Sequence, residues 1–133
     1  MVRDLARPPR ESFDTVLAQA ARDVAERAGL HLRLELDPRA DPEASTRHAL
    51  VRIVSEAVSN AANHARAQEV VVQLIAQPRL RVSISDDGVG FDPNKVNGSG
   101  YGLVSMRERA DAFGGTLWLD STPGNGTTVT VLA

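Results

Sequence analysis

Several features that point to particular classes of protein are missing from this sequence. Its 133 residues include no cysteine, which excludes disulfides and thiolate zinc sites. No apolar stretch approaches the ~18 residues that cross a bilayer, and the N-terminus lacks the apolar core of a signal peptide. The formal net charge is -2 without a basic run, so nucleic acid and membrane surfaces are not expected partners. We expect a cytoplasmic domain, alone or as the cytoplasmic part of a membrane-anchored protein.

The hydrophobic pattern predicts three helices and five strands within one domain. The first 11 residues are charged and contain proline, as in a linker, and residues 12–133 form the expected domain. Apolar residues at helical spacing predict helices over residues 12–28, about 42–65 and about 101–113. Alternating residues predict strands over residues 31–37, 69–77, 79–86, 116–122 and 127–133. Trp118, with apolar neighbours in such a strand, is expected in the core.

The order of these elements indicates an α+β fold. Most consecutive strands are joined as hairpins, which favours a two-layer sandwich with three helices on one face of a mixed, largely antiparallel five-stranded sheet. Strands and helices do not alternate as βαβ units, so the glycines of the chain are not a dinucleotide fingerprint. The Gly-Lys-Ser/Thr ending of a phosphate-binding P-loop is also missing.

Two glycine clusters lie within residues 85–103 and suggest a binding function for this loop. One cluster begins at Asp86 after a strand, and the other begins at Gly98 before a helix. Free N–H groups at a glycine-preceded helix N-terminus favour anions such as phosphates. A single Gly-x-Gly is usually an ordinary surface turn, but two clusters in one loop favour a binding function. Asp87 is expected to be solvated or to hold the turn.

Polar residues also form a stripe on the second predicted helix. Glu56, Asn60 and Asn63 are spaced at i, i+4 and i+7, and His64 borders them. The alternative interpretation is a solvated helix face.

Three motifs in order carry a resemblance to a known family: EAVSNAANH at 56–64, DDGVGF at 86–91 and GSGYGL at 98–103. Together they resemble the Bergerat-type ATP-binding domain shared by DNA gyrase, heat-shock chaperones, sensor histidine kinases and mismatch-repair ATPases. The segments GLVSMRER at 102–109, GGTL at 114–117 and PGNGT at 123–127 are most similar to sensor kinases of the nitrate-sensor type. The resemblance covers the chain from Ser12 onward.

The resemblance implies an ATP and Mg²⁺ site with assigned roles. Asp86 would accept a hydrogen bond from the adenine amino group, Gly88 and Gly90 would let the backbone approach the base, and Thr127 would lie at the adenine end. Asn60 would be the protein ligand of Mg²⁺, and Glu56 the catalytic residue, orienting or accepting a proton from the attacking group. The remaining nucleotide-binding residues expected around the phosphates and in the lid are Asn63, His64, Gly98, Gly100, Gly102 and Leu103. Asn63 occupies a position where the family often has a basic residue, which implies weaker binding of the phosphates.

The expected activity is transfer of the γ-phosphoryl of Mg-ATP to a histidine on a separate dimerisation domain of the same kinase, with a response regulator as an indirect partner. None of His31, His48 and His64 is followed by an acidic residue, as a phosphoacceptor usually is. The segment 3–9 resembles the tail that joins the two domains, so we expect a piece of a longer kinase. The alternatives are an anti-sigma-factor-type serine protein kinase, which the MRER and PGNGT segments disfavour, and a non-catalytic nucleotide-sensing module, which Glu56 disfavours.

Overall fold

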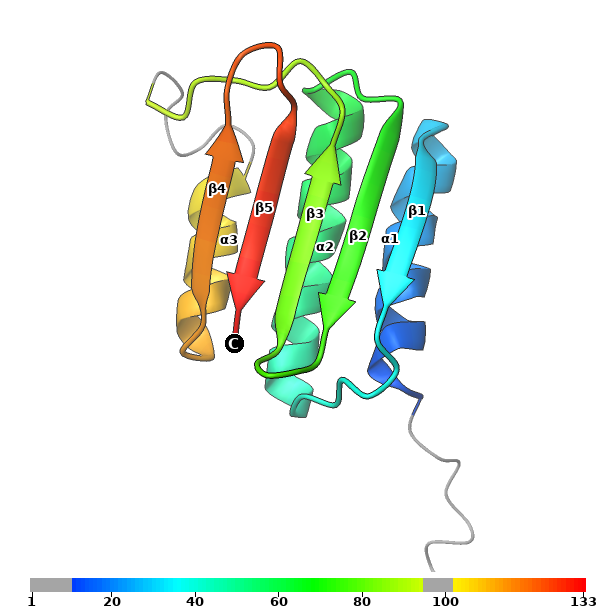
Figure 1. The fold of residues 1–133 in the computed structure, drawn as a ribbon, viewed down its shortest axis with the longest axis vertical. Coiled ribbons are helices and arrows are strands. Elements are labelled where there is room, and N and C mark those ends of the chain that lie inside the picture. The colour runs from blue at the N-terminus through cyan, green and yellow to red at the C-terminus, as the bar shows by residue number, and fades with distance from the viewer. Residues whose placement is uncertain (1–10, 95–101) are drawn as a thin grey trace, which may run out of the picture.

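A computed structural model describes residues 11–94 and 102–133 of the chain. Three helices lie on one face of a five-stranded sheet, in two layers (Figure 1). The elements in order are α1 (Phe13–Ala28), β1 (His31–Leu36), α2 (Ala44–Asn63), β2 (Glu69–Ile75), β3 (Arg81–Asp86), α3 (Leu103–Ala112), β4 (Thr116–Ser121) and β5 (Thr127–Leu132). The predicted α+β fold is confirmed.

The sheet is mixed, as the sequence predicts. Its strand order is β1-β2-β3-β5-β4, in which β1 and β2 are parallel and all other neighbours are antiparallel. The parallel pair arises because α2 carries the chain back between β1 and β2, whereas β2 and β3 form the expected hairpin at Gln77–Pro78. This order places β3 and β5 side by side at the middle of the molecule.

The core lies between the helices and the inner face of the sheet. Phe13 of α1, Ile53 of α2 and Val72 of β2 are completely buried there. The expectation that Trp118 belongs to the core is wrong, because its side chain is 48% exposed. Successive side chains of a strand point to opposite faces, and the helices cover only one face of this sheet. Trp118 therefore lies on the uncovered face.

The helix α2 is shorter at both ends than the sequence predicts. It begins after Glu43, its N-cap, and ends at Asn63, with His64 as the C-cap. The N–H groups of His64 and Ala65 both donate to the carbonyl of Asn60, at 2.9 and 3.1 Å. The chain then turns toward β2. This end of α2 therefore lies at the same edge of the molecule as the end of β3 and the start of α3 (Figure 1).

No helix in the described part of the chain is long and apolar enough to cross a membrane.

Candidate functional site

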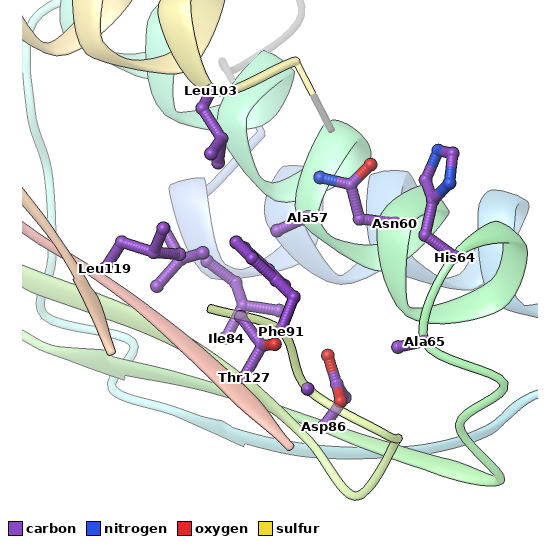
Figure 2. A pocket seen from close by; sticks show the side chains of 12 residues that line it. Ala57, Asn60, His64, Ala65, Ile84, Asp86, Phe91, Leu103, Leu119 and Thr127 are labelled. Carbon is purple, nitrogen blue, oxygen red and sulfur yellow. The ribbon is translucent and has the colours of Figure 1, made fainter. Parts of the chain in front are cut away.

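A cavity lies between α2, the first residue of α3, and the inner face of β3, β4 and β5 (Figure 2). It contains about 400 Å³ of space, part of it open to solvent. Six residues singled out from the sequence line it: Asn60, His64, Asp86, Gly90, Leu103 and Thr127. The fold thus brings together segments that are far apart in the chain.

The walls of the cavity are apolar, and its polar groups lie at two ends. Ile84, Leu119 and the ring of Phe91 form one wall in Figure 2. Asp86 lies at one end of the cavity, while Asn60 and His64 project from α2 across from it (Figure 2). Apolar walls with polar groups at the ends suit a ligand that has both an apolar part and a strongly polar part.

Asp86 supplies a half-buried carboxylate at the end of β3. Its Oδ1 accepts a hydrogen bond from the Gly88 N–H at 2.8 Å. Burial raises the pKa of Asp86 above the ordinary value of 3.8, although N–H groups of Gly88 and Thr127 act in the opposite direction. The negative charge of Asp87 raises the pKa further. A partly desolvated carboxylate of this kind is well suited to accept a hydrogen bond from a donor group of a ligand.

The two glycines after Asp86 are required by close contacts within the protein. A Cβ atom at Gly88 would meet the carbonyl of Ala65, and one at Gly90, which has φ of 65°, would meet the carbonyl of Thr122. The Val89 N–H also donates to the Ala65 carbonyl at 2.8 Å. Gly88 therefore fixes the loop against the end of α2 and does not line the cavity, whereas Gly90 does.

The polar stripe predicted on α2 is divided between two sides of the helix. Asn60 and His64 line the cavity, but Glu56 and Asn63 do not. Glu56 lies against Gly102, where an added Cβ would meet its carboxylate, and it lines a polar hollow between the helices. Asn63 donates to the Ser59 hydroxyl at 3.1 Å and faces a hollow between α1 and α2.

Two further residues of the site have no counterpart in the sequence-based prediction. Phe91 lines the cavity. Ser121 is only 6% exposed, and it contacts both the Phe91 N–H and the Thr127 hydroxyl. A signal for Ser121 was present in the sequence, because alternation places it on the inner face of β4 with Leu117 and Leu119, where a polar residue needs a partner. Gly98 and Gly100, predicted to belong to the lid, lie outside the described residues.

The described residues do not form a metal-binding cluster of their own. No group of three or more histidine, aspartate or glutamate side chains is gathered within residues 11–94 and 102–133. A metal ion in this cavity would therefore need most of its ligands from the bound molecule and from water. The amide oxygen of Asn60 is of the hard type that Mg²⁺ prefers.

Comparison with known proteins gives a consistent result. The model of a family described as "Histidine kinase-, DNA gyrase B-, and HSP90-like ATPase" matches residues 45–133. The signal transduction histidine-protein kinase/phosphatase UhpB of Salmonella typhimurium is 38% identical over 130 residues, covering 92% of this chain and 26% of its own length. The nitrate/nitrite sensor protein NarQ of Escherichia coli is 37% identical over 130 residues, covering 96% of this chain and 22% of its own. The chain thus spans about a quarter of the length of these relatives.

A solved structure shares the same architecture. The histidine kinase domain of the Erythrobacter litoralis EL346 blue-light activated histidine kinase superposes with a TM-score of 0.72 at 24% identity. The superposition covers 97% of this chain and 66% of that chain. At this identity the likeness concerns the fold.

Proposed function

The chain belongs to the histidine kinase-, DNA gyrase B- and HSP90-like ATPase family, as the catalytic ATPase domain of a sensor histidine kinase, and we propose that it binds Mg-ATP and donates the γ-phosphoryl to a histidine of another domain. The resemblance to kinases of the nitrate-sensor type is confirmed. The observation that carries the proposal is the shared cavity, in which Asp86 and Thr127 of the sheet lie across from Asn60 and His64 of α2.

The base end of the proposed site is formed by the sheet. Asp86 accepts a hydrogen bond from the amino group of adenine, and Thr127 lies beside Asp86 on the neighbouring strand. The apolar side chains of Ile84 and Leu119, together with the Phe91 ring, give the flat base a dry surface. Such burial contributes roughly 25 cal/mol per Å² of apolar area removed from water.

The phosphate end is formed by α2 and the start of α3. Asn60 offers its amide oxygen to Mg²⁺, and His64 lies one turn further along the same side of the helix. Mg²⁺ commonly binds through one or two protein ligands while phosphates and waters complete its shell. Bound there, the ion would neutralise the charge that develops on the γ-phosphoryl during transfer. Leu103 is the first residue of α3, whose N-terminus favours an anion.

Glu56 is assigned to the transfer step. Its carboxylate lies beside Gly102, just before α3, and it faces the hollow between the helices while Asn60 faces the cavity. We propose that the acceptor histidine approaches Glu56 from this hollow. The carboxylate can then orient the attacking imidazole or accept its proton. The transfer forms a bond from phosphorus to the imidazole nitrogen and breaks the bond to the β-γ bridging oxygen, so that ADP leaves.

The proposed partners are those that membership of the sensor histidine kinase family implies. The acceptor is a histidine-bearing dimerisation domain of the same kinase, and a response regulator receives the phosphoryl group from it. Because ATP is the phosphoryl donor, we place this domain on the cytoplasmic side.

The proposal is tested with radiolabelled ATP and a separately purified histidine-bearing domain. Calorimetry should first show one ATP site per chain, tightened by Mg²⁺. Acid-labile, alkali-stable phosphate should then accumulate on the added domain. ATP binding without transfer to any histidine domain would instead favour a nucleotide-sensing module, and the position of Glu56 outside the cavity lining makes this second candidate worth the measurement.

A further inference from the structure

We infer that Ser121 is a positioning residue that fixes the direction of the Thr127 hydroxyl and thereby makes the cavity select adenine over guanine. This inference rests on the proposed function, since it concerns the base of the nucleotide. It goes further in assigning base specificity to a buried residue outside the cavity lining.

Three polar residues form a row across neighbouring strands. Asp86 of β3 is paired with Thr127 of β5, and Thr127 is paired in turn with Ser121 of β4. Residues directly opposite one another in a sheet point to the same face. The row therefore runs from the carboxylate in the cavity, through the Thr127 hydroxyl, to the buried hydroxyl of Ser121.

Ser121 makes three hydrogen bonds with its one hydroxyl group. Its Oγ accepts from the Phe91 N–H at 2.9 Å, and its O–H points to the Gly126 carbonyl at 3.1 Å. Its third contact is with Thr127 Oγ1 at 2.8 Å, where either oxygen could be the donor. A serine hydroxyl has one proton and two lone pairs, so these three contacts use all of its capacity.

The carbonyl of Gly126 decides which hydroxyl donates. A carbonyl oxygen only accepts, so the single proton of Ser121 is committed to Gly126. The bond between the two hydroxyls must then be donated by Thr127, to the remaining lone pair of Ser121. Thr127 has no second proton, and only its lone pairs remain for a ligand in the cavity.

Two neighbouring hydrogen-bond acceptors favour the binding of adenine and disfavour the binding of guanine. The ionised carboxylate of Asp86 is an acceptor, and Thr127 becomes one through Ser121. The exocyclic amino group of adenine carries two N–H donors at the position where guanine carries a carbonyl oxygen. Guanine would bring a third acceptor to this place and leave buried polar groups unpaired, which strongly disfavours a ligand.

Removal of the Ser121 hydroxyl releases the proton of Thr127. In Ser121→Ala, Thr127 can turn its O–H into the cavity and donate to a guanine carbonyl. The experiment measures the Kd of ATP and of GTP by calorimetry on the wild-type chain and its variants. We expect the ratio of the GTP Kd to the ATP Kd to fall by about 5–10-fold, the effect of one redirected hydrogen bond. If Ser121 had a purely structural role, Ser121→Ala would weaken the binding of ATP and GTP equally and leave the ratio of their Kd values unchanged.

Matched variants isolate the hydroxyl of Ser121. Ser121→Thr keeps the hydroxyl and should retain the wild-type ratio. Ser85→Ala is the control, because Ser85 and Thr128 form a similar hydroxyl pair at 2.7 Å between β3 and β5, away from the cavity lining. Its ratio should equal that of the wild type. In the background of Thr127→Val, adding Ser121→Ala should change the ratio no further, since Ser121 acts through Thr127.

The outcomes distinguish failure of the inference from failure of the proposed function. A wild-type chain that binds ATP and GTP equally, or a folded Ser121→Ala variant with the wild-type ratio, would overturn the inference and leave ATP binding standing. A chain that binds neither nucleotide would overturn the proposed function and the inference with it. If Ser121→Ala does not fold, the same Kd ratio is measured in Thr127→Val and Thr127→Ser. The ratio should fall in Thr127→Val and stay at the wild-type value in Thr127→Ser. An unchanged ratio in Thr127→Val would contradict the inference.

Discussion

Asp86 and Asp87 are adjacent carboxylates that have different partners. Asp86 lines the cavity, and burial raises its pKa. The Asp87 Oδ1 accepts hydrogen bonds from the Gln68 and Glu69 N–H groups at 2.9 and 3.0 Å, and these bonds lower the pKa of Asp87. These bonds tie Asp87 to the start of β2, and the side chain is otherwise exposed to solvent. Of the two carboxylates, Asp86 is the one placed to bind a ligand.

Asp86→Asn tests the assignment of the base. The amide keeps an acceptor oxygen but adds an N–H₂ donor that can meet the adenine amino group, so we expect ATP binding to weaken by about 1–3 kcal/mol. Calorimetry measures the change. Asp87→Asn is the matched control, with ATP affinity equal to the wild type. Equal affinities in all three proteins would mean that the adenine amino group does not bind at Asp86.

The raised pKa of Asp86 predicts a pH dependence of ATP binding. A protonated carboxyl presents an O–H donor, so ATP affinity should fall as the pH is lowered through a pKa above the ordinary 3.8. The effect on folding has the opposite sign: a raised pKa in the folded state means that the ionised form costs stability at neutral pH, and this cost disappears as the pH falls. In Asp86→Asn, the fall in ATP affinity that is caused by protonation of Asp86 should be missing. Identical pH profiles of ATP affinity in the wild type and in Asp86→Asn would contradict this prediction.

At the scale of elements, the division of the polar stripe follows from the geometry of α2. Successive residues of an α-helix turn by about 100°. Asn60 and His64 are therefore rotated by about 40° and about 80° from Glu56, whereas Asn63 is rotated by about 20° the other way. Because the cavity lies on one side of the helix, it receives Asn60 and His64 and excludes Glu56 and Asn63.

Asn60→Ala tests the metal ligand on this helix. The variant lacks the amide oxygen, so Mg²⁺ should no longer strengthen ATP binding, while binding without Mg²⁺ should be little affected. Calorimetry with and without the ion measures both. Asn63→Ala makes the comparison within the same helix, and from its place in the structure we expect ATP affinity within about 0.5 kcal/mol of the wild type, as for an ordinary surface substitution. A loss as large as that of Asn60→Ala would support the sequence-based assignment of Asn63 to the phosphates.

Glu56→Gln separates nucleotide binding from phosphoryl transfer. The side chain keeps its size and loses its charge, so ATP affinity should stay within about 1 kcal/mol of the wild type. The transfer rate to a supplied histidine domain should fall by roughly 10²–10⁴-fold, the usual contribution of a general base. Glu108→Gln, on the exposed side of α3, provides the control and should transfer at the wild-type rate. Wild-type transfer by Glu56→Gln would show that Glu56 belongs to a solvated helix face and takes no part in the transfer.

The sequence predicts elements better than it predicts contacts between them. Periodicity and glycines locate three helices and five strands, because these signals depend on neighbouring residues. Trp118 was misplaced because alternation gives two faces without saying which one the helices cover. The hydrogen-bond partners of Ser121 are Phe91, Gly126 and Thr127, and they could not be predicted from the sequence. Gly126 and Thr127 lie beside Ser121 only because of the register of β4 with β5.

At the scale of the whole molecule, the candidate site lies at one edge of a two-layer sandwich. The end of α2, the end of β3 and the starts of α3 and β5 meet at this edge (Figure 1). Within residues 11–94 and 102–133, no helix lies on the other face of the sheet, which exposes Trp118. The histidines outside the cavity are remote from it. His31 begins β1, which is separated from β3 by β2, and His48 precedes Asn60 by 12 residues, or roughly 18 Å of helix.

This arrangement predicts that the chain does not phosphorylate itself. Transfer needs a nucleophile in line with the leaving oxygen, and His31 and His48 are too far from the cavity to supply one. His64, the C-cap of α2, lines the cavity together with Asn60, and we propose that it contacts the phosphates there as a binding group. Incubation with γ-labelled ATP should therefore leave the chain unlabelled, and label should appear only when a histidine-bearing domain is added. Stoichiometric, alkali-stable label on the chain alone, lost in His64→Gln, would show that the chain contains its own phosphoacceptor.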